Sequence, residues 1–558
     1  MKILKPSKDR LWCVVLPSIM FGLATAIGRT MDKYNSFYGI KTSPVKYTAL
    51  FVGSGLIFFT LAYLLFGYIE NAKPAEKSEN KLFAFLFDRK PFFIPFCAFI
   101  VAWLPYIVSF RGRPGWDFCS QVEMFFGNIP FTNHHPVFST VCYGLVMKIC
   151  CDLGFDRAGI PLFAFFQTLS MAAMLSLILV SLKRIPHIAR FVILAVFAFS
   201  PGIALFSVCV CKDLAYALFF ALFTLSVYFI IRDKTLSPKK LAFFVIVSVM
   251  CVLLRNNGFH VLAPSVILLF FVKGISKKQT AAVLGAVCLT YIAMHNIIQP
   301  ALGIPESSIR AAIVKTAQRK TTPKESTREI LSMPFQQTAR YIIAHGEEIT
   351  PEEKNTIDKV LVYDKIAERY NPIVSDPVKN LYLQRNPSKE DLLNYSRLWF
   401  THMRKHPMTY AAAAINNTYG YFYPAKPGKI GARLYPVTEQ RLRKLYYCEE
   451  TVKWLGLPDN AYTRKLAKLR NVCLRTPILK FFTDIPFFTW LMIIACFYMI
   501  KREKYVYLPA VIPCLLTLLV CLVSPVNGEL RYALPYMFCA PFFIGLCFLL
   551  NEENHENK

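Results

Sequence analysis

The run Leu214-Ala-Tyr-Ala-Leu-Phe-Phe-Ala-Leu-Phe-Thr-Leu-Ser-Val-Tyr-Phe-Ile-Ile231 has no charged residue, whereas Lys212-Asp213 precedes it and Arg232-Asp233-Lys234 follows it. About 20 apolar residues in an α-helix cross the hydrocarbon core of a membrane. A helix satisfies its own backbone hydrogen bonds, but an open strand would leave backbone groups unpaired in lipid. The run therefore predicts a membrane-spanning helix with charges at both ends.

The same pattern recurs along the chain of 558 residues, of which 55% are hydrophobic and 15% aromatic. This composition excludes an ordinary soluble protein and predicts an all-α, polytopic membrane protein. The 17 cysteines lie mostly in apolar sequence and imply neither a disulfide framework nor a zinc site. Apolar segments fall near residues 11–28, 47–69, 92–110, 136–152, 158–182, 191–209, 214–231, 241–257, 258–273, 279–299, 484–500, 505–523 and 531–550.

Basic loops predict the sidedness of these segments, because short loops rich in Lys and Arg face the cytoplasm. All the short basic loops fall on the same side of the membrane if the segment 136–152 lies along the interface or re-enters instead of crossing. This segment is short and opens with Pro136. We therefore expect about twelve spans with both termini cytoplasmic and a first span that is retained in the mature protein. A single bent helix at Arg255-Asn-Asn-Gly258 would change the count. The cytoplasmic stretches would be the N-terminus, 70–91, 183–190, 232–240, 273–278 and 501–504.

Four parts follow from this topology. Residues 1–91 hold two spans and a cytoplasmic loop, 92–299 form the transmembrane core, and 484–558 hold three spans and a cytoplasmic tail. The polar region 300–483 is expected outside the cytoplasm as a mainly helical domain, with helical stretches at Glu325–His345 and Lys389–Asn417. The net charge of +29 is spread in short clusters, which favours anionic lipids or phosphate-bearing substrates over nucleic acid.

A polar segment at the mouth of a predicted span is the first candidate site. It reads Gly115-Trp-Asp-Phe-Cys-Ser-Gln-Val-Glu-Met-Phe-Phe-Gly127 and is followed by Asn133-His-His-Pro136. Ionisable residues beside a bilayer are costly, so Asp117, Glu123, His134 and His135 are functional candidates. Asp117 is placed to act as a general base on a hydroxyl, and each histidine can hydrogen-bond a phosphate. The alternatives are a helix cap at Asp117 and interface anchoring by the histidines, whose adjacency makes a poor metal pair.

Three further sequences interrupt apolar runs on the same predicted face or near it. Lys212-Asp213 can bring a second carboxylate to Asp117, with one acid as base and the other orienting the acceptor, the donor or a divalent cation. Arg255 and Arg531 can hold a phosphate, because a guanidinium is a permanent bidentate donor. The alternative for the Lys212-Asp213 pair is a solvated salt bridge, and for the arginines interfacial snorkelling.

These residues resemble those of the GT-C superfamily, multi-spanning glycosyltransferases that use polyprenyl-phosphate-linked sugars and include protein O-mannosyltransferases and lipid A aminoarabinose transferases. The resemblance covers about residues 90–235 and rests on Asp117, the His135-Pro136 step, the Lys183-Arg184 turn and Asp213. It implies that Asp117 is the general base and Asp213 the second acid, with Arg531, Lys212 and His135 touching phosphate. The chain departs from the superfamily because two spans precede the catalytic loop and the polar region precedes the last three spans.

Over nearly its whole length the chain also resembles a large uncharacterised family of bacterial membrane proteins. The resemblance rests on three sequence motifs: Gly-Trp-Asp at 115–117, Asn-His-His-Pro-Val-Phe-Ser-Thr at 133–140 and Pro-Phe-Gln-Gln-Thr-Ala-Arg at 334–340. This resemblance suggests a bacterial, Gram-positive source and implies no substrate.

The expected function is inverting transfer of a sugar from a polyprenyl-phosphate donor to an extracytoplasmic acceptor, either an envelope glycan or a lipid. Membrane lipids are expected partners, nucleic acid is not, and a divalent cation is left open as a cofactor. The alternative functions are a transporter or lipid-linked oligosaccharide flippase, a polysaccharide polymerase or ligase, and a structural envelope scaffold.

Overall fold

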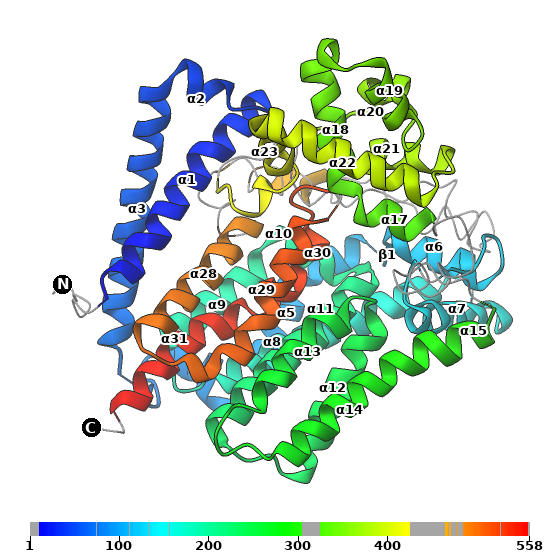
Figure 1. Ribbon diagram of the computed structural model, residues 1–558. Helices are drawn as coiled ribbons and strands as arrows, with labels where there is room; N and C mark the ends of the chain where they lie inside the picture. The colour runs from blue at the N-terminus through cyan, green and yellow to red at the C-terminus, as the bar shows by residue number, and fades with distance from the viewer. Residues whose placement is uncertain are drawn as a thin grey trace.

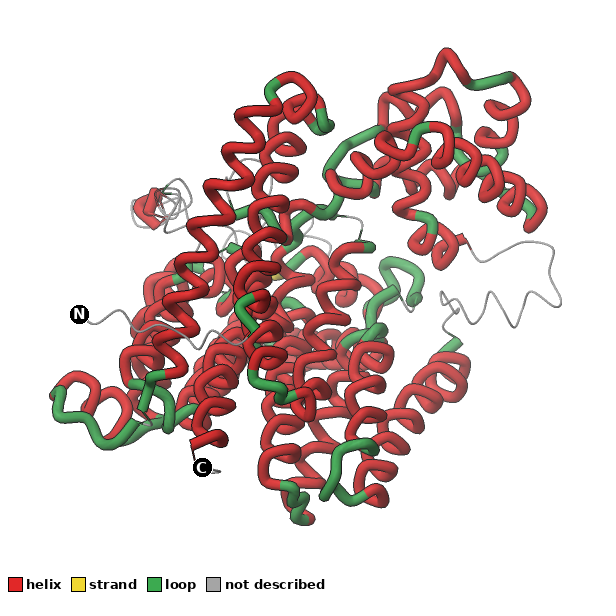
Figure 2. The backbone as a smooth tube through the Cα atoms, turned by 60° about the vertical axis from the view of Figure 1, so that its left-hand side comes forward, coloured by secondary structure: helices red, strands yellow, loops and turns green. Residues whose placement is uncertain are grey.

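The computed structural model describes residues 10–303, 324–424 and 484–555, except 74, 111, 133, 156 and 525, together with scattered residues of 464–482. Helices dominate these residues (Figure 2), and the two named strands, β1 Arg113–Pro114 and β2 Cys209–Val210, have only two residues each. The predicted all-α class is confirmed. Of the expected polar domain, residues 304–323, 425–463 and much of 464–483 lie outside the described part.

Seven described helical stretches are long and apolar enough to cross a membrane, and the number rises to nine if each of two bent pairs forms one span. This supports a membrane protein, while the predicted count of about twelve is not confirmed. The seven stretches are α1 Trp12–Tyr34, α3 Pro44–Glu70, α8 Gly159–Ser181, α11 Lys212–Asp233, Lys277–Ala301 (α14 Lys277–Ala293 to α15 Gln299–Ala301), Tyr505–Leu522 (ending in α29 Leu508–Leu522) and Leu530–Leu550 (α30 Leu530–Phe538 and most of α31 Ala540–His555).

Sharp bends separate two pairs of helices, and one of them divides a segment that the sequence suggested as continuous. Helix α9 (His187–Phe199) meets α10 (Pro201–Ser207) at a bend of 64°, and Lys81–Arg89 meets α5 (Phe93–Ser109) at 108°. Pro201 lacks a backbone N–H and disfavours helical geometry at Ser200, which explains the first bend. The segment expected at 191–209 is therefore two helices followed by β2.

The sequence Arg255-Asn-Asn-Gly258 forms a hairpin turn between two helices, α12 (Pro238–Leu254) and α13 (Gly258–Leu269). The two helices pack against each other. A Cβ at position 258 would collide with the carbonyl oxygen of Cys251, so the turn requires glycine. The predicted division at this point is confirmed.

The basic stretches predicted on one side of the membrane gather at one end of the helix bundle, which we call the basic end. The backbone N–H of Ala75 donates to Arg184, His187 pairs with Asp88, and Arg10 pairs with Glu503. A cavity of about 1110 Å³ at this end is lined by six cationic side chains and one acidic side chain, together with apolar residues. The cationic residues are Lys183, Arg184, Arg232, Lys234, Lys273 and Lys504.

At the opposite end, a helical cap sits on the bundle (Figure 1). Its helices are α17 Lys324–Ile330, α18 Ser332–His345, α19 Pro351–Asp358, α20 Tyr363–Arg369, α21 Asp376–Lys379, α22 Lys389–Lys405 and α23 Pro407–Asn416. They enclose a core that includes Phe335, Val360 and Tyr382, all fully buried. The helices predicted at Glu325–His345 and Lys389–Asn417 are thus present, with breaks at Leu331 and His406.

The cap is fastened to the bundle by polar contacts around residue 527. The Asn527 side chain donates to the carbonyl oxygen of Asn416 at 2.7 Å and accepts from the backbone N–H of Gly420 at 2.8 Å. Asn416 in turn donates to the carbonyl oxygen of Asn35 at the end of α1. The segment that enters α30 is therefore held between the cap and the bundle.

Candidate functional site

Two short parallel strands place the polar loops side by side. Arg113 pairs with Cys209 and Pro114 with Val210, so α6 (Trp116–Phe125) and α11 begin next to each other. The side chain of Gln167 on α8 supports β2 by donating to the carbonyl oxygen of Cys209 at 2.7 Å. Asp117 and the Lys212-Asp213 pair thus lie in the first turns of neighbouring helices.

Asp117 is held by two cations that come from distant parts of the sequence. Its Oδ2 forms an ion pair with Lys212 Nζ, and its Oδ1 lies 3.0 Å from Arg531 Nη1. Lys212 Nζ also donates to Nδ1 of His135, at 3.2 Å. Asp117 is 18% exposed and Arg531 30%, so a ligand can reach this group, which we call the Asp117 cluster.

Electrostatics set the charges of the Asp117 cluster. Burial would raise the pKa of the Asp117 carboxyl, but Lys212 and Arg531 hold it well below its usual range. Burial and then the charge of Lys212 lower the pKa of His135 to about 3, so this imidazole is neutral at pH 7. Because Nδ1 accepts from Lys212, the ring proton belongs on Nε2. The cluster therefore combines two fixed cations, one ionised carboxylate and one neutral imidazole.

Asp213 lies at the same end of the bundle as Asp117 but has a different partner. Its Oδ1 is 3.8 Å from Arg255 Nη1, an atom that has no hydrogen-bond partner among the described residues. The guanidinium of Arg255 lies 5.9 Å from the ring centre of Tyr532, and that of Arg531 lies 4.9 Å from the same ring. Tyr532 thus connects the Asp213–Arg255 pair to the Asp117 cluster.

Glu529 is an acidic neighbour that the sequence analysis did not single out. Its Oε1 lies 3.7 Å from Arg531 Nε, and both Asp117 and Asp213 act on it electrostatically. Burial raises the pKa of the Glu529 carboxyl. The signal for Glu529 and Tyr532 was their position in Val526-Asn-Gly-Glu-Leu-Arg-Tyr532, the same interruption of apolar sequence that indicated Arg531.

The other two predicted residues are His134 and Glu123. His134 is exposed, and its ring centre is 4.7 Å from that of His135. Glu123 is buried, and its Oε1 has no hydrogen-bond partner among the described residues. Gln121, which precedes Glu123 on α6, donates to Ser139 and Thr140 at the start of α7 (Val137–Asp152). Helix α7 has 16 residues and is not among the candidate spans found in the described part.

Helix α17 of the cap lies close to the site. Burial raises the pKa of Glu329 on α17, but Lys379 outweighs this effect and lowers it, and His134 makes a smaller contribution in the same direction. Figure 1 shows α17 beside α6 at this end of the molecule. The cap, the α6 loop and the start of α30 thus surround the same group of charges.

A family profile matches residues 127–558, and its description is a family of unknown function, DUF6020. The chain belongs to the DUF6020 family. It matches no curated protein and no solved structure. The DUF6020 match includes His134, His135, Lys212, Asp213, Arg255 and Arg531, whereas Asp117 and Glu123 precede it.

Proposed function

We propose that this DUF6020 chain is a membrane glycosyltransferase of the GT-C type, which moves a sugar from a polyprenyl-phosphate donor to an extracytoplasmic acceptor. The observation that supports this most is the convergence of Asp117, Lys212 and Arg531 at one end of an apolar bundle. A carboxylate next to two cations and beside the membrane suits a reaction in which a hydroxyl is activated and a lipid phosphate departs.

The cations of the site suit the donor phosphate. Lys212 and Arg531 already bind one anion, Asp117, and Arg255 Nη1 is buried with unused hydrogen-bonding capacity among the described residues. Arriving phosphate would compete with Asp117 for Lys212 and Arg531. As those contacts shift to phosphate, the Asp117 carboxylate loses its strongest partners, its pKa rises, and it becomes a better base.

In the transfer step Asp117 takes the proton of the acceptor hydroxyl while the acceptor oxygen bonds to the anomeric carbon. The bond from that carbon to the phosphate oxygen breaks, and its electron pair leaves with polyprenyl phosphate. Attack from the face opposite the phosphate inverts the anomeric centre. Lys212 and Arg531 stabilise the charge on the departing phosphate, and the acceptor is an envelope glycan or lipid.

The proposal includes the topology expected from the sequence. The basic end faces the cytoplasm with both termini, and about twelve spans carry the site and the cap to the other side. In support, the cationic lining of the cavity and the basic stretches share one end of the bundle.

The test is transfer of a labelled sugar from polyprenyl-phosphate donors in purified membranes. Asp117→Asn should lower the transfer rate at least about 100-fold, since a general base contributes roughly 10²–10⁴. Asp152→Asn is the matched control, because Asp152 forms an exposed ion pair with Lys148 on nearby α7 and should leave the rate unchanged. Transfer that survives the Asp117 substitution in a folded protein would remove the proposed base.

A lipid-linked oligosaccharide flippase, transporter or polymerase is the second candidate, favoured by the cationic cavity at the basic end. A cavity of about 1110 Å³ that combines six cations with apolar walls suits the head of an anionic lipid on that side. As a flippase or transporter, wild-type protein in vesicles would move a labelled polyprenyl-phosphate sugar across the bilayer without attaching it to an acceptor, whereas a polymerase would join one lipid-linked chain to another.

A further inference from the structure

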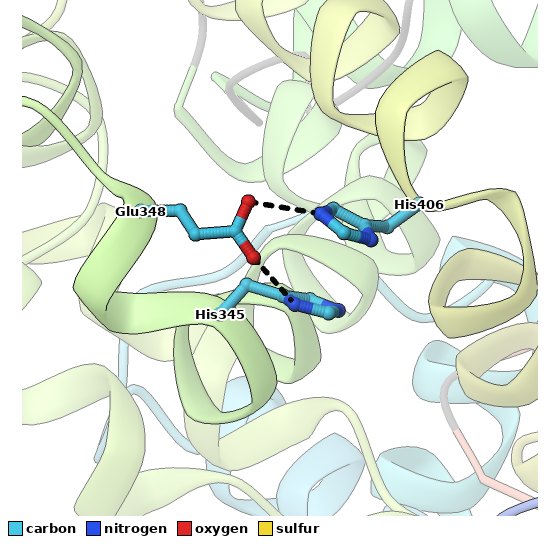
Figure 3. A group of neighbouring side chains, drawn as sticks. All are labelled: His345, Glu348 and His406. Carbon is cyan, nitrogen blue, oxygen red and sulfur yellow. Dashed lines mark hydrogen bonds and ion pairs between the residues drawn. The ribbon is translucent and has the colours of Figure 1, made fainter.

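A second group of chemically active side chains lies in the cap, away from the Asp117 cluster. His345 ends α18, and Glu348 follows three residues later in the short helix η3 (Gly346–Glu348). His406 lies at the corner between α22 and α23. Figure 3 shows both imidazoles turned toward the Glu348 carboxylate, one on each oxygen.

The geometry of this group is tight. His345 Nδ1 lies 3.1 Å from Glu348 Oε1, and His406 Nε2 lies 3.0 Å from Glu348 Oε2. One ligand atom from each of the three residues falls within 4.8 Å of the other two. The imidazole rings stack at 3.6 Å between centres, with 15° between their planes.

We propose that His345, Glu348 and His406 form a binding site for a divalent transition metal of the zinc class. Two imidazole nitrogens and one carboxylate are a common zinc ligand set. Zinc bonds of about 2.0–2.1 Å in a tetrahedron place neighbouring ligand atoms roughly 3.3 Å apart. The present nitrogen-to-oxygen separations are already close to that value, so metal binding requires mainly that the two rings turn from parallel until their lone pairs converge.

Neighbouring side chains hold the three proposed ligands in position by hydrogen bonds, as the partners of metal-binding side chains do in zinc sites. His345 Nε2 lies 3.0 Å from Thr409 Oγ1, so its second nitrogen can keep a proton while Nδ1 faces the metal. Lys405 Nζ lies 2.8 Å from Glu348 Oε2 and so helps to hold the carboxylate beside the two imidazoles. Lys405 is 50% exposed, so it can withdraw into water if the metal takes both oxygens.

Three protein ligands leave one position of a tetrahedral metal open. Glu348 is 38% exposed, so that position faces solvent and would hold water or an anionic group. The metal would also join the end of α18 to the α22–α23 corner, two elements far apart in the sequence. This inference does not depend on the glycosyltransferase proposal.

The test uses the full chain, purified in detergent with a tag that lacks histidine, and ZnCl₂ as the probe in calorimetric titration. We expect one zinc per chain, and Co²⁺ in its place should show the visible absorption of a tetrahedral site. His406→Gln should weaken zinc binding at least about 100-fold, beyond the roughly 10- to 100-fold loss typical of an outer-shell change.

The matched control is His402→Gln, which removes an imidazole one helical turn away. His402 is buried and stacks on Tyr341 at 4.0 Å, but it is not a proposed ligand. This variant should bind zinc with wild-type stoichiometry once its folding is checked by thermal unfolding. Equal zinc affinity in the wild type and His406→Gln, or no binding by the folded wild type, would reduce the group to a hydrogen-bonded network and overturn the proposal.

Discussion

At the scale of single residues, the candidate site depends on charges that are buried together instead of being dispersed in water. Asp117, Lys212 and Arg531 were predictable because ionisable residues that interrupt apolar sequence are costly and therefore conspicuous. Their pairing was not predictable, since it depends on which helix ends meet. From the sequence, Asp117 and Asp213 were expected to share one site, and in the structure Arg531, Tyr532 and Arg255 connect them.

The neutral state of His135 predicts how stability depends on pH. The folded-state pKa of about 3 lies below the ordinary value of 6.5, so between these values the unfolded chain binds a proton that the folded chain does not. Stability should therefore fall as the pH drops below 6.5, by at most about 1.4 kcal/mol per pH unit from this group. Asp117, whose carboxyl has an ordinary pKa of 3.8, adds to this loss only at lower pH, where the unfolded chain begins to protonate it while Lys212 and Arg531 keep the folded carboxylate ionised.

The measurement is the melting temperature of purified protein between pH 7 and pH 5. His135→Gln removes this titrating imidazole, so the melting temperature of the variant should fall less between pH 7 and pH 5 than that of the wild type. Identical slopes for the wild type and His135→Gln would contradict a neutral, buried His135.

At the scale of elements, turns and bends decide which residues reach the site. Helix α12 carries Arg255 to Asp213, and the hairpin turn then sends α13 back to the basic end, where Leu268 lines the cavity. The hairpin was predictable because Asn-Asn-Gly interrupts two apolar runs. The bend between α9 and α10 was not, because hydrophobicity alone does not distinguish one long helix from two short ones.

Gly258 provides a test of the hairpin. Gly258→Ala should lower the stability of the purified protein by about 1–3 kcal/mol, since the added methyl collides with the backbone of Cys251. Gly285→Ala is the matched control: a Cβ at this position of α14 meets nothing within 4 Å, so the protein should gain roughly 0.5–1 kcal/mol of stability. Thermal unfolding of both variants gives the comparison, and a neutral Gly258→Ala would show that the turn is looser than described.

At the scale of the whole molecule, the two ends of the bundle differ in chemistry. One end gathers mostly cationic side chains around a cavity, whereas the other combines balanced charges with a helical cap. The charge rule grouped the basic loops correctly, because each loop carries its own signal in sequence. The number of membrane-spanning helices was harder to predict from the sequence, because several helices are short or bent.

Cysteine labelling with a membrane-impermeant maleimide tests the absolute orientation. Lys273→Cys at the basic end should react only after cells are permeabilised, and Glu347→Cys in the cap should react in intact cells; both native residues are exposed. Replacing Cys97, the exposed cysteine among the described residues, lowers the background reaction. The opposite pattern would invert the topology and place the Asp117 cluster in the cytoplasm.

The ion pair between Asp117 and Arg531 also has a consequence for biosynthesis. Asp117 and Lys212 enter the membrane early in translation, but their guanidinium partner lies on α30 and emerges only after the cap has been made. Until then a ribosome-bound chain holds a carboxylate and an ammonium without the arginine that completes the group. If the chain acts as the proposed glycosyltransferase, nascent, partly inserted chains are expected to be inert toward lipid-linked sugars, and activity would begin only once membrane insertion has passed residue 531.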